Sequence, residues 1–495
     1  MQAFNPYLPS WEYVPDGEPH VFGDRLYVYG SHDAFNGHQF CINDYVCWSA
    51  PVDDLGDWKF EGEIYRRNQD PVNPKGRQYM NAPDVCMGPD GRYYLYYQLQ
   101  MENTTSVAVS DKPEGPFEYY GTVHHPDGRK YGLKKDAYNF DPGMLVDDDG
   151  RIYMYTGFSP DSGLLRFVMG LRGGTYNGGS VVELEPDMLT IRGREHPTIP
   201  GAAKATGTPF EQHPFFEASS PRKINGTYYL IYSSLLSHEL CYATSSSPLG
   251  PWDFGGTIVS IGDIGLNGRT LENARNFTGN THGGLVCIND QWYIFYHRQT
   301  NQQKCARQGC AEKITVLPDG SIPQVEITSC GLNSGALMAE GVYEARIACN
   351  LWGKSGTYPY VKAHHMEAAY PFLTQSGSDR EHTPDQYIAN MLDGATAGFK
   401  YFEFDGNKSY DLRIRVRTKG SGQGQISVYT YAEPLQKAKD DALVCSIPVK
   451  PAENWTNLHG QLKALSYKQA LYFQYTGDGA IDFMEFELSG KPKKD

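Results

Sequence analysis

The 495-residue sequence lacks any apolar run approaching the roughly 18 residues that mark a membrane-spanning helix. It also lacks a secretory signal. The opening residues MQAFNPYLPSWEYVPDGEP hold neither a basic nor an apolar segment, and Pro6, Pro9 and Pro15 would interrupt one. We therefore expect a cytoplasmic protein with no membrane partner; a signal that had been cleaved off would leave the same sequence.

The ten cysteines form no CxxC pair and no metal-finger spacing. Their scatter favours reduced, packed thiols, with a Cys305–Cys310 disulfide as the alternative. The net charge of −14 argues against a nucleic-acid partner. The sequence also has no phosphate-binding loop and no nucleophile elbow, so neither of those chemistries is indicated.

What the sequence does have is glycine, proline and tyrosine, at 53, 31 and 36 residues, and few long Ala/Glu/Lys/Leu tracts. This composition predicts an all-β protein with many short strands and turns. The length predicts two or three domains. Aromatic residues reach 13%; their rings would suit sugar binding, although most of them are expected to fill sheet cores.

One pattern repeats along the first two thirds of the chain. A polar or titratable residue precedes a short strand, then a turn rich in Gly, Asp and Asn, then an aromatic, alternating strand. The copies are residues 15–31, 82–98, 140–157, 216–234 and 281–298. A weaker second hairpin follows several of them, at 49–62, 110–121 and 246–256. Five such four-stranded units predict a five-bladed β-propeller.

The titratable residue that opens each copy stands 10–12 residues before an aligned tyrosine. These residues are Asp16, Asp84, Asp141, Glu217 and His282. The innermost strand of each propeller blade lines a central channel, so residues at one register should converge on one cavity. Clustered acids repel and are costly to desolvate, which makes a functional reason for the cluster more plausible than stability. The alternative is that each acid caps a turn at its strand entry.

Converging carboxylates are what glycosidic bond cleavage needs. One protonated carboxyl donates to the leaving oxygen, and a second, ionised carboxylate activates water or attacks directly. A third charge nearby can raise the pKa of the donor and keep it protonated.

The inner-strand Asp, Asp, Glu set and the closing HGGLV…WYIFYHR resemble glycoside hydrolase family 43 over residues 1–335. The resemblance implies an inverting five-bladed propeller enzyme of the β-xylosidase or α-L-arabinofuranosidase type. It implies Asp16 as the general base, Asp141 as the residue that tunes and orients the acid, and Glu217 as the general acid.

The resemblance also implies roles around these three. His282 would lie near a hydrated calcium ion in the central channel, the alternative being a packed histidine without an ion. Arg298, in YHRQT, would reach toward the sugar, and Asp84 would shape the pocket or bond a sugar hydroxyl. The sequence departs from the family pattern at Pro15-Asp16-Gly17-Glu18-Pro19, where Glu18 is a rival base because it shares a strand face with Asp16. The signatures of the related, retaining β-fructosidases are absent.

The last third of the chain reads as a separate unit. Residues 336–345 are expected to be a linker, and residues 346–495 a jelly-roll β-sandwich, because LRIRVRT and ISVYTY alternate as sandwich strands do. This part resembles a family 6 carbohydrate-binding module. The resemblance implies a structural calcium near Glu367 and sugar held by Tyr387 and Trp455. The alternative is a domain that only buttresses the propeller.

The sequence therefore predicts an inverting exo-glycosidase that takes terminal xylose or arabinofuranose from xylan-derived oligosaccharides. The alternative from another class is a non-catalytic sugar-binding propeller. Xylose versus arabinose preference, exo versus endo action and oligomeric state stay open.

Overall fold

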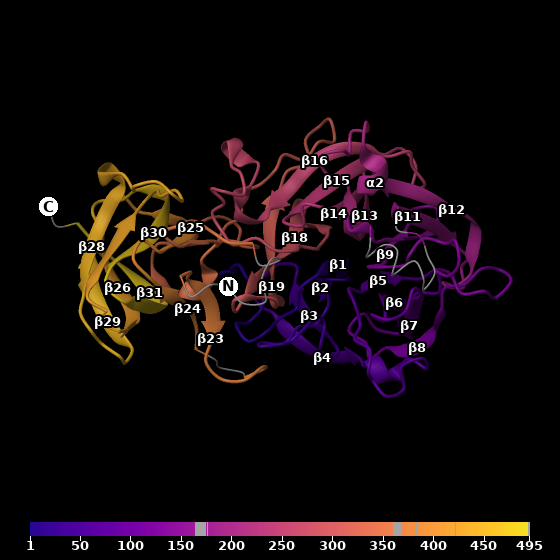
Figure 1. Cartoon of the computed structure of the whole chain (residues 1–495), viewed down its shortest axis with the longest axis horizontal. Helices are drawn as coiled ribbons and strands as arrows, with labels where there is room; N and C mark the ends of the chain where they lie inside the picture. Colours follow the sequence, from indigo (N-terminus) through magenta and orange to yellow (C-terminus); the bar gives the residue numbers. More distant parts are fainter. Residues whose placement is uncertain (164–174, 176, 360–368, 382–384, 421, 494–495) are drawn as a thin grey trace.

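The computed structural model describes residues 1–163, 175, 177–359, 369–381, 385–420 and 422–493. Two sheet-rich bodies lie next to each other along the long axis of the molecule (Figure 1). The N-terminal body runs from indigo to salmon in the figure and the C-terminal body from orange to yellow. The all-β prediction is confirmed.

The N-terminal body, in its described residues, contains five antiparallel sheets that follow one another along the chain, with the strands of each sheet in sequence order. The first comprises β1 (Glu18–Phe22), β2 (Arg25–Tyr29), β3 (Tyr45–Pro51) and β4 (Lys59–Tyr65). The second comprises β5 (Asp84–Met87), β6 (Tyr93–Gln98), β7 (Thr105–Ser110) and β8 (Glu118–Thr122). The third comprises β9 (Gly143–Val146), β10 (Ile152–Gly157), β11 (Gly178–Leu184) and β12 (Ile191–Pro200). The fourth comprises β13 (Phe215–Ile224), β14 (Thr227–Ser234), β15 (Glu239–Ser245) and β16 (Asp253–Ser260), and the fifth β17 (Leu285–Ile288), β18 (Gln291–Thr300) and β19 (Gln303–Ile314).

The fifth sheet has three strands among the described residues, where four were expected. The reason is that the chain leaves it after β19 and returns to the fourth sheet. Val325 N donates to Ile258 O at 2.8 Å and Val325 pairs in parallel with Val259, so this stretch extends the neighbouring sheet.

The first hairpin of each sheet is set by local turn chemistry. Between β13 and β14 the turn residues Asn225 and Gly226 have φ of 50° and 82°, the left-handed pair that a type I′ hairpin requires. The following strand then alternates its aromatic side chains between two faces, and Tyr229 and Tyr232 are buried.

The first strands of successive sheets contact one another. His20 Nε2 lies 2.6 Å from Asp84 Oδ1, joining β1 to β5, and Asp84 Oδ2 accepts from Met144 N of β9 at 2.7 Å. A side chain on Gly143 would run into the backbone carbonyl of Ser219 in β13, so glycine permits that close approach.

The contacts continue around to the first sheet. Arg222 Nε on β13 donates to Leu285 O of β17, and Gly17 pairs in parallel with Gly283, just before β1 and β17. The residues that open the five repeats are thereby brought together in the middle of this body, where β1, β5, β9 and β13 lie in Figure 1.

The C-terminal body consists of two six-stranded sheets that share one core. One sheet comprises β20 (Leu337–Met338), β22 (Asn350–Trp352), β25 (Thr396–Phe404), β27 (Gly424–Tyr429), β28 (Leu443–Val449) and β30 (Tyr467–Gly477). The other comprises β21 (Gly341–Glu344), β23 (Phe372–Gln375), β24 (Gln386–Met391), β26 (Lys408–Lys419), β29 (Thr456–Gln461) and β31 (Ala480–Pro492). Phe399 from the first sheet packs 4.9 Å from Phe486 of the second, ring centre to ring centre, so the sheets lie face to face.

The segment 336–345 is not the linker that the sequence predicted. It contains β20, which pairs with β25, and β21, which pairs with β31. Because its backbone is taken up by both C-terminal sheets, this segment belongs to the second body.

Buried ion pairs join the two bodies. Lys400 Nζ lies 3.1 Å from Asp263 Oδ2 and 3.0 Å from Glu326 Oε2. Only 1% of the surface of Lys400 is accessible to solvent. Glu433 pairs with Arg269 and Arg275. The C-terminal body is thus docked onto the N-terminal body through charged groups that are mostly buried, with Glu326 the more exposed partner at 35%.

The structure bears on two further predictions from the sequence. All ten cysteines are free, so the Cys305–Cys310 alternative is wrong. No helix among the described residues is long and apolar enough to cross a membrane.

Candidate active site

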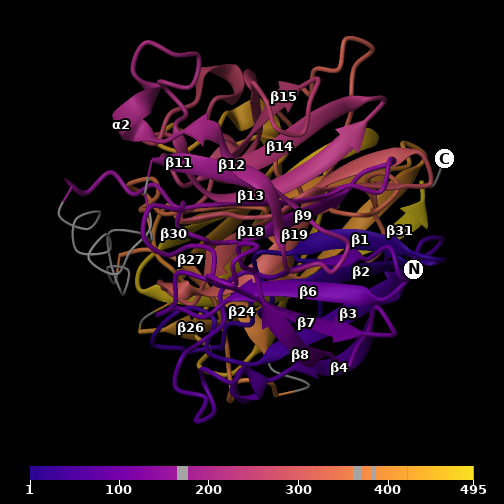
Figure 2. The ribbon, with the colours of Figure 1, turned by 90° about the vertical axis from the view of Figure 1, so that its right-hand side faces the viewer.

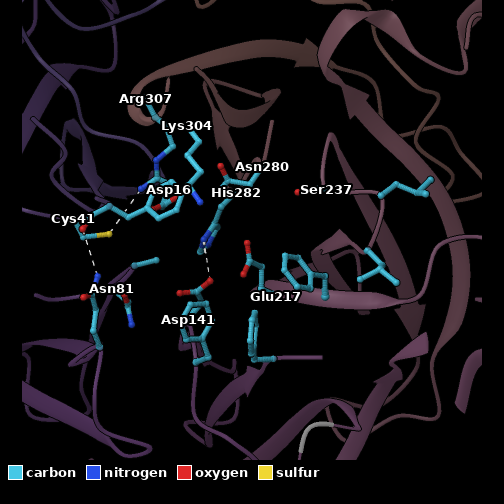
Figure 3. Close-up of a pocket in the computed structure, with 18 residues that line it drawn as sticks. Asp16, Cys41, Asn81, Asp141, Glu217, Ser237, Asn280, His282, Lys304 and Arg307 are labelled. Atoms are coloured by element: carbon cyan, nitrogen blue, oxygen red, sulfur yellow. Dashed lines mark hydrogen bonds and ion pairs between the residues drawn. The ribbon is translucent and has the colours of Figure 1, made fainter. Parts of the chain in front are cut away.

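A cavity of about 560 Å³ opens where the five repeats meet (Figure 3). Its polar lining includes Asp16, Asp141, Glu217, His282 and Arg307. Its apolar lining includes Phe40, Phe140, Phe158, Phe216, Leu235 and Leu236. Four of the five residues that open the repeats therefore share one cavity, as their common register predicted.

The backbone at these positions is held in a conformation that L-residues rarely adopt. Asp16 and Asp141, each two residues before the start of β1 and β9, have φ of 57° and 48°, and Ala218, next to Glu217, has φ of 68°. The pairing of β13 with β14 also shifts register on both sides of Glu217. Such conformations each cost on the order of 1 kcal/mol or more and concentrate at functional sites. Here they accompany carboxyl groups that turn from the strand ends into the cavity.

Asp16 is held as a carboxylate. Arg307 Nη1 donates to Asp16 Oδ1 at 2.8 Å, and Asp16 N donates to His297 Nδ1 at 3.2 Å. Burial alone would raise the Asp16 pKa, but the Arg307 guanidinium, with His297 and His282, outweighs it and lowers the pKa to about 2. Asp16 is consequently ionised at neutral pH and is suited to accept a proton.

His282 lies between two carboxylates. Its Nδ1 is 3.6 Å from Asp141 Oδ2 and its Nε2 is 3.6 Å from Glu18 Oε1. Burial lowers the pKa of His282, but the charges of Glu18, Asp141 and Asp16 together outweigh burial and raise it to about 9. An imidazolium ion at this position favours the charged form of Asp141.

Asp141 and Glu217 titrate as a pair. Burial raises the pKa of both carboxyls, and the charge of Asp141 raises that of Glu217 further. Because His282 stabilises the negative charge on Asp141, the proton that the pair retains resides on Glu217. Figure 3 shows the two carboxyl groups beside each other, facing His282. The site thus holds one ionised and one protonated carboxyl group, at Asp16 and Glu217.

Two acids of the repeat region do not face the cavity. Asp84 is fully buried and accepts hydrogen bonds from His20 and from the backbone of Val85 and Met144, so it ties strands together instead of lining the pocket. Glu18 accepts from Arg222 Nη2 and from Ser220 Oγ, both at 2.9 Å, and is not part of the cavity lining. Of the two rival bases, only Asp16 reaches the cavity.

Arg298 is not placed where the sequence resemblance put it. Its guanidinium donates to the carbonyls of Arg346 and Ala348, at the start of the C-terminal body. The physical reason is strand alternation. His297 on β18 faces Asp16, so its neighbour Arg298 must point to the opposite side of the sheet.

Arg307 is the functional residue that the sequence reasoning missed. It lies on β19 opposite Gln299, which shares a strand face with His297. The signal was available in principle. Arg307 pairs with Gln299, and the side chains of Gln299 and His297 lie on the same face of β18. The Arg307 side chain therefore points to the cavity that His297 faces.

The remaining predicted residues lie in the C-terminal body. Tyr387 and Trp455 come together with ring centres 5.4 Å apart, and the Arg417 guanidinium lies over both rings at 4.9 and 4.5 Å. Neither ring lines the cavity. Glu367 lies outside the described residues.

The described residues around His282 do not fit a directly bound calcium ion. Glu18, His20 and Asp84 place one ligand atom each within 4.8 Å of one another. Arg222 and Ser220, however, already occupy one Glu18 oxygen, and His20 is bonded to Asp84. Glu18 Oε1 is the carboxylate oxygen left without a hydrogen-bond partner, whereas calcium takes six to eight oxygen ligands. Arg222 and His282 balance the negative charge here, which supports the packed-histidine alternative.

Comparison with known proteins gives a consistent picture. The family model described as glycosyl hydrolases family 43 matches residues 13–322. A xylosidase/arabinosidase from Thermoclostridium stercorarium is 46% identical over 490 residues, covering 98% of this chain and 99% of that protein.

Two solved structures are also similar. A family 43 β-xylosidase/α-arabinofuranosidase from a compost microbial metagenome, in complex with xylotriose and in a calcium-free form, has a TM-score of 0.51. It is 25% identical, and the match covers 66% of this chain and 99% of that one. A family 43 arabinoxylan arabinofuranohydrolase from Bacillus subtilis, in complex with cellotetraose, has a TM-score of 0.50 at 21% identity. That match covers 98% of this chain and 97% of the other, and it bears on the fold alone.

Proposed function

The chain belongs to glycosyl hydrolase family 43, and from that premise we propose that it is an inverting exo-glycosidase releasing terminal xylose or arabinofuranose from xylan-derived oligosaccharides. It is a glycoside hydrolase whose relative over nearly the full chain is named a xylosidase/arabinosidase. The observation that carries the mechanism is the pairing, in one cavity, of an ionised Asp16 with a protonated Glu217.

In the proposed reaction Asp16 takes a proton from a water molecule as that water attacks the anomeric carbon. Glu217 gives its proton to the glycosidic oxygen as the bond between that oxygen and the anomeric carbon breaks. The new bond forms on the face opposite the one that breaks, so the released sugar has the inverted configuration. Solvent then carries the proton from Asp16 back to Glu217, which restores the site.

Asp141 and Arg307 keep each carboxyl in its working state. The negative charge of Asp141 raises the pKa of Glu217, so Glu217 stays protonated until it donates to the leaving oxygen. The Arg307 guanidinium lowers the pKa of Asp16, so Asp16 stays ionised. The cavity wall formed by Phe140, Phe158 and Phe216 offers aromatic surface to a sugar face. The ring centre of Phe158 lies 4.9 Å from that of Phe140 and 5.2 Å from that of Phe216, so this wall is continuous.

The proposal includes the five-bladed propeller and the jelly roll. In it, the five N-terminal sheets are blades, and the pairing of Gly17 with Gly283 closes the ring. The jelly-roll topology of the C-terminal body and its likeness to a family 6 carbohydrate-binding module stay predictions. A sugar at Tyr387 and Trp455 would compete with Arg417 for the ring faces that its guanidinium covers.

A calcium ion held through water molecules near His282 also stays a prediction. Since Arg222 and His282 balance the charge of this channel, we expect catalysis to proceed without the ion.

The test of the function is release of nitrophenol from aryl β-xylosides and aryl α-L-arabinofuranosides, with NMR of the first product formed. We expect turnover by the wild type and inverted product. In Glu217→Gln we expect a large loss of activity on xylo-oligosaccharides and a smaller loss on the nitrophenyl glycosides, whose leaving group needs little protonation. Retained configuration would remove Asp16 as the base. If the wild type and Glu217→Gln were equally inactive while xylo-oligosaccharides still bound, the non-catalytic sugar-binding alternative would hold.

A further inference from the structure

A segment of the C-terminal body reaches back to the wall of the active-site cavity. After β23 the chain runs through residues 376–381, and Asp379 there contacts the N-terminal body at two points. Asp379 Oδ1 accepts from Phe35 N at 2.7 Å, and Asp379 Oδ2 accepts from Asn43 Nδ2 at 3.2 Å. One carboxylate therefore binds both ends of residues 35–43, which we call the wall loop.

The wall loop carries two residues of the cavity lining, Phe40 and Cys41. The Phe40 ring centre lies 4.7 Å from Arg307 Cζ, so the loop covers the guanidinium that holds Asp16. Cys41 N donates to Asp33 Oδ1 at 2.9 Å, and Asp33 Oδ2 accepts from Arg307 Nε at 2.7 Å. Any movement of the wall loop is thus transmitted to the cavity.

The wall loop has little regular structure to hold it in place. None of its residues lies in a strand, because β2 ends at Tyr29 and β3 begins at Tyr45. A bond that spans the two ends of such a loop removes much of its conformational freedom. Asp379 supplies that bond from outside the N-terminal body.

The segment bearing Asp379 is itself anchored. The neighbouring Arg380 Nη1 donates to Glu12 Oε1 at 2.8 Å and Oε2 at 3.1 Å, and its guanidinium lies 5.3 Å from the Trp11 ring centre. On the other side, Tyr13 OH donates to Gln375 Oε1 at 2.7 Å. Because the residues flanking Asp379 are fixed to the N-terminal body, its carboxylate is presented to the loop in a defined position.

We propose that Asp379 of the C-terminal sandwich is a positioning residue for the active site, fixing the wall loop so that Phe40 and Cys41 complete the sugar-binding cavity. Its kinetic consequence rests on the proposed glycosidase function. The C-terminal body then contributes to substrate affinity through the shape of the cavity, whether or not it binds sugar itself.

The experiment compares the full-length wild type with Asp379→Ala, Asp379→Asn and a matched control, Glu433→Gln. The control breaks another charged contact between the two bodies, with Arg269 and Arg275, none of which lines the cavity. With an aryl glycoside, we expect Asp379→Ala to raise KM about tenfold and to change kcat less than about threefold. Asp379→Asn keeps an acceptor for Phe35 N, so its KM should lie between the KM of the wild type and that of Asp379→Ala. Glu433→Gln should keep the wild-type KM.

A second readout does not depend on activity. Cys41 is only 4% exposed, so its alkylation by iodoacetamide, followed peptide by peptide with mass spectrometry, reports the opening of the wall loop. We expect alkylation of Cys41 to be about tenfold faster in Asp379→Ala and unchanged in Glu433→Gln.

The outcomes separate cleanly. A variant that merely folds less well would lose kcat and keep KM. Wild-type KM and wild-type Cys41 alkylation in Asp379→Ala would overturn the inference, as would equal effects in Glu433→Gln. A wild type without glycosidase activity would overturn the proposed function, and the Cys41 rates would still decide the role of Asp379.

Discussion

Arg307 Nη1 donates to Asp16 Oδ1 at 2.8 Å although 291 residues separate the two in the sequence. The same guanidinium bonds Asp33 through Nε and Nη2, at 2.7 and 3.1 Å, so it is fixed on both sides. This relationship gives the proposed base its charge and links it to the last strand of the N-terminal body. It also makes the pH dependence of the reaction predictable.

Replacing Arg307 by Met should move the acidic limb of the kcat/KM profile to higher pH. Asp16 must be ionised to act as a base, and its pKa is about 2 because Arg307, His297 and His282 overcome burial. Without the guanidinium, burial raises the pKa, so activity is lost at a higher pH as the medium is acidified. Lys304→Met removes another cation of the cavity lining that makes no bond to Asp16, and should move the limb less. An unmoved limb in Arg307→Met would contradict the role of Arg307.

Replacing Asp141 by Asn should move the alkaline limb to lower pH. Glu217 must be protonated to donate, and activity is lost as the pH rises through its pKa. Burial and the Asp141 charge raise that pKa, so removing the charge lowers it. Asp84→Asn is the matched control, because Asp84 is equally buried and outside the cavity lining. Its alkaline limb should stay in place, and a common shift in both variants would point to a general loss of structure.

Replacing Glu217 by Gln should affect poor leaving groups most. A general acid contributes roughly 10²–10⁴-fold where the leaving oxygen needs a proton. We therefore expect kcat on a xylo-oligosaccharide to fall by about 10³-fold, and kcat on an aryl glycoside with an acidic phenol to fall far less. Steady-state kinetics on both substrates measures the difference. Equal losses on the two would argue that Glu217 is not the proton donor.

Replacing Lys400 by Met should lower the free energy of unfolding by about 3 kcal/mol, because the buried carboxylate of Asp263 loses its nearest cation and keeps only Arg275 Nη1, at 3.8 Å, as a charged partner. Lys354→Met is the control. Lys354 pairs with Asp393 at the surface, with its side chain 73% exposed, and its loss should change stability by less than about 1 kcal/mol. Calorimetry of the two variants measures the contrast, and similar small effects would show that the pair at the junction contributes little.

Removal of divalent ions should leave the reaction largely intact. The Arg222 guanidinium and the His282 imidazolium neutralise Glu18 and Asp141, so the channel needs no further positive charge. After dialysis against EDTA we expect kcat to stay within about twofold. A tenfold or greater rise on adding calcium back would show that this charge balance is incomplete.

The position of the site could be predicted from the sequence, because residues at the same position of successive repeats lie at the start of successive sheets and meet at the centre of the N-terminal body. Asp16, Asp141, Glu217 and His282 were found in this way. The same register failed for Asp84, whose direction is set by its bond to His20 on the neighbouring sheet. A pattern within one repeat carries no information about such a partner.

The errors have two physical origins, which are strand alternation and pairing between distant segments. Arg298 was chosen by its place in a motif, whereas strand alternation directs it to Arg346 and Ala348. The segment 336–345 looked like a linker because β20 and β21 are short, and both exist by pairing with the much later strands β25 and β31. Arg307 was missed because its side of the sheet was not inferred from the pairing of β18 with β19, and Asp379 was missed because its partners Phe35 and Asn43 lie 344 and 336 residues away.

The parallel pairing of Gly17 with Gly283 has a consequence for how the protein is made. A ribosome releases the chain from its N-terminus, so Asp16 emerges long before residue 283 closes against it and before Arg307 can neutralise it. Until then Asp16, Asp141 and Glu217 belong to an incomplete cavity that is open to water. Activity therefore cannot appear gradually during translation; it is switched on when the late segments arrive.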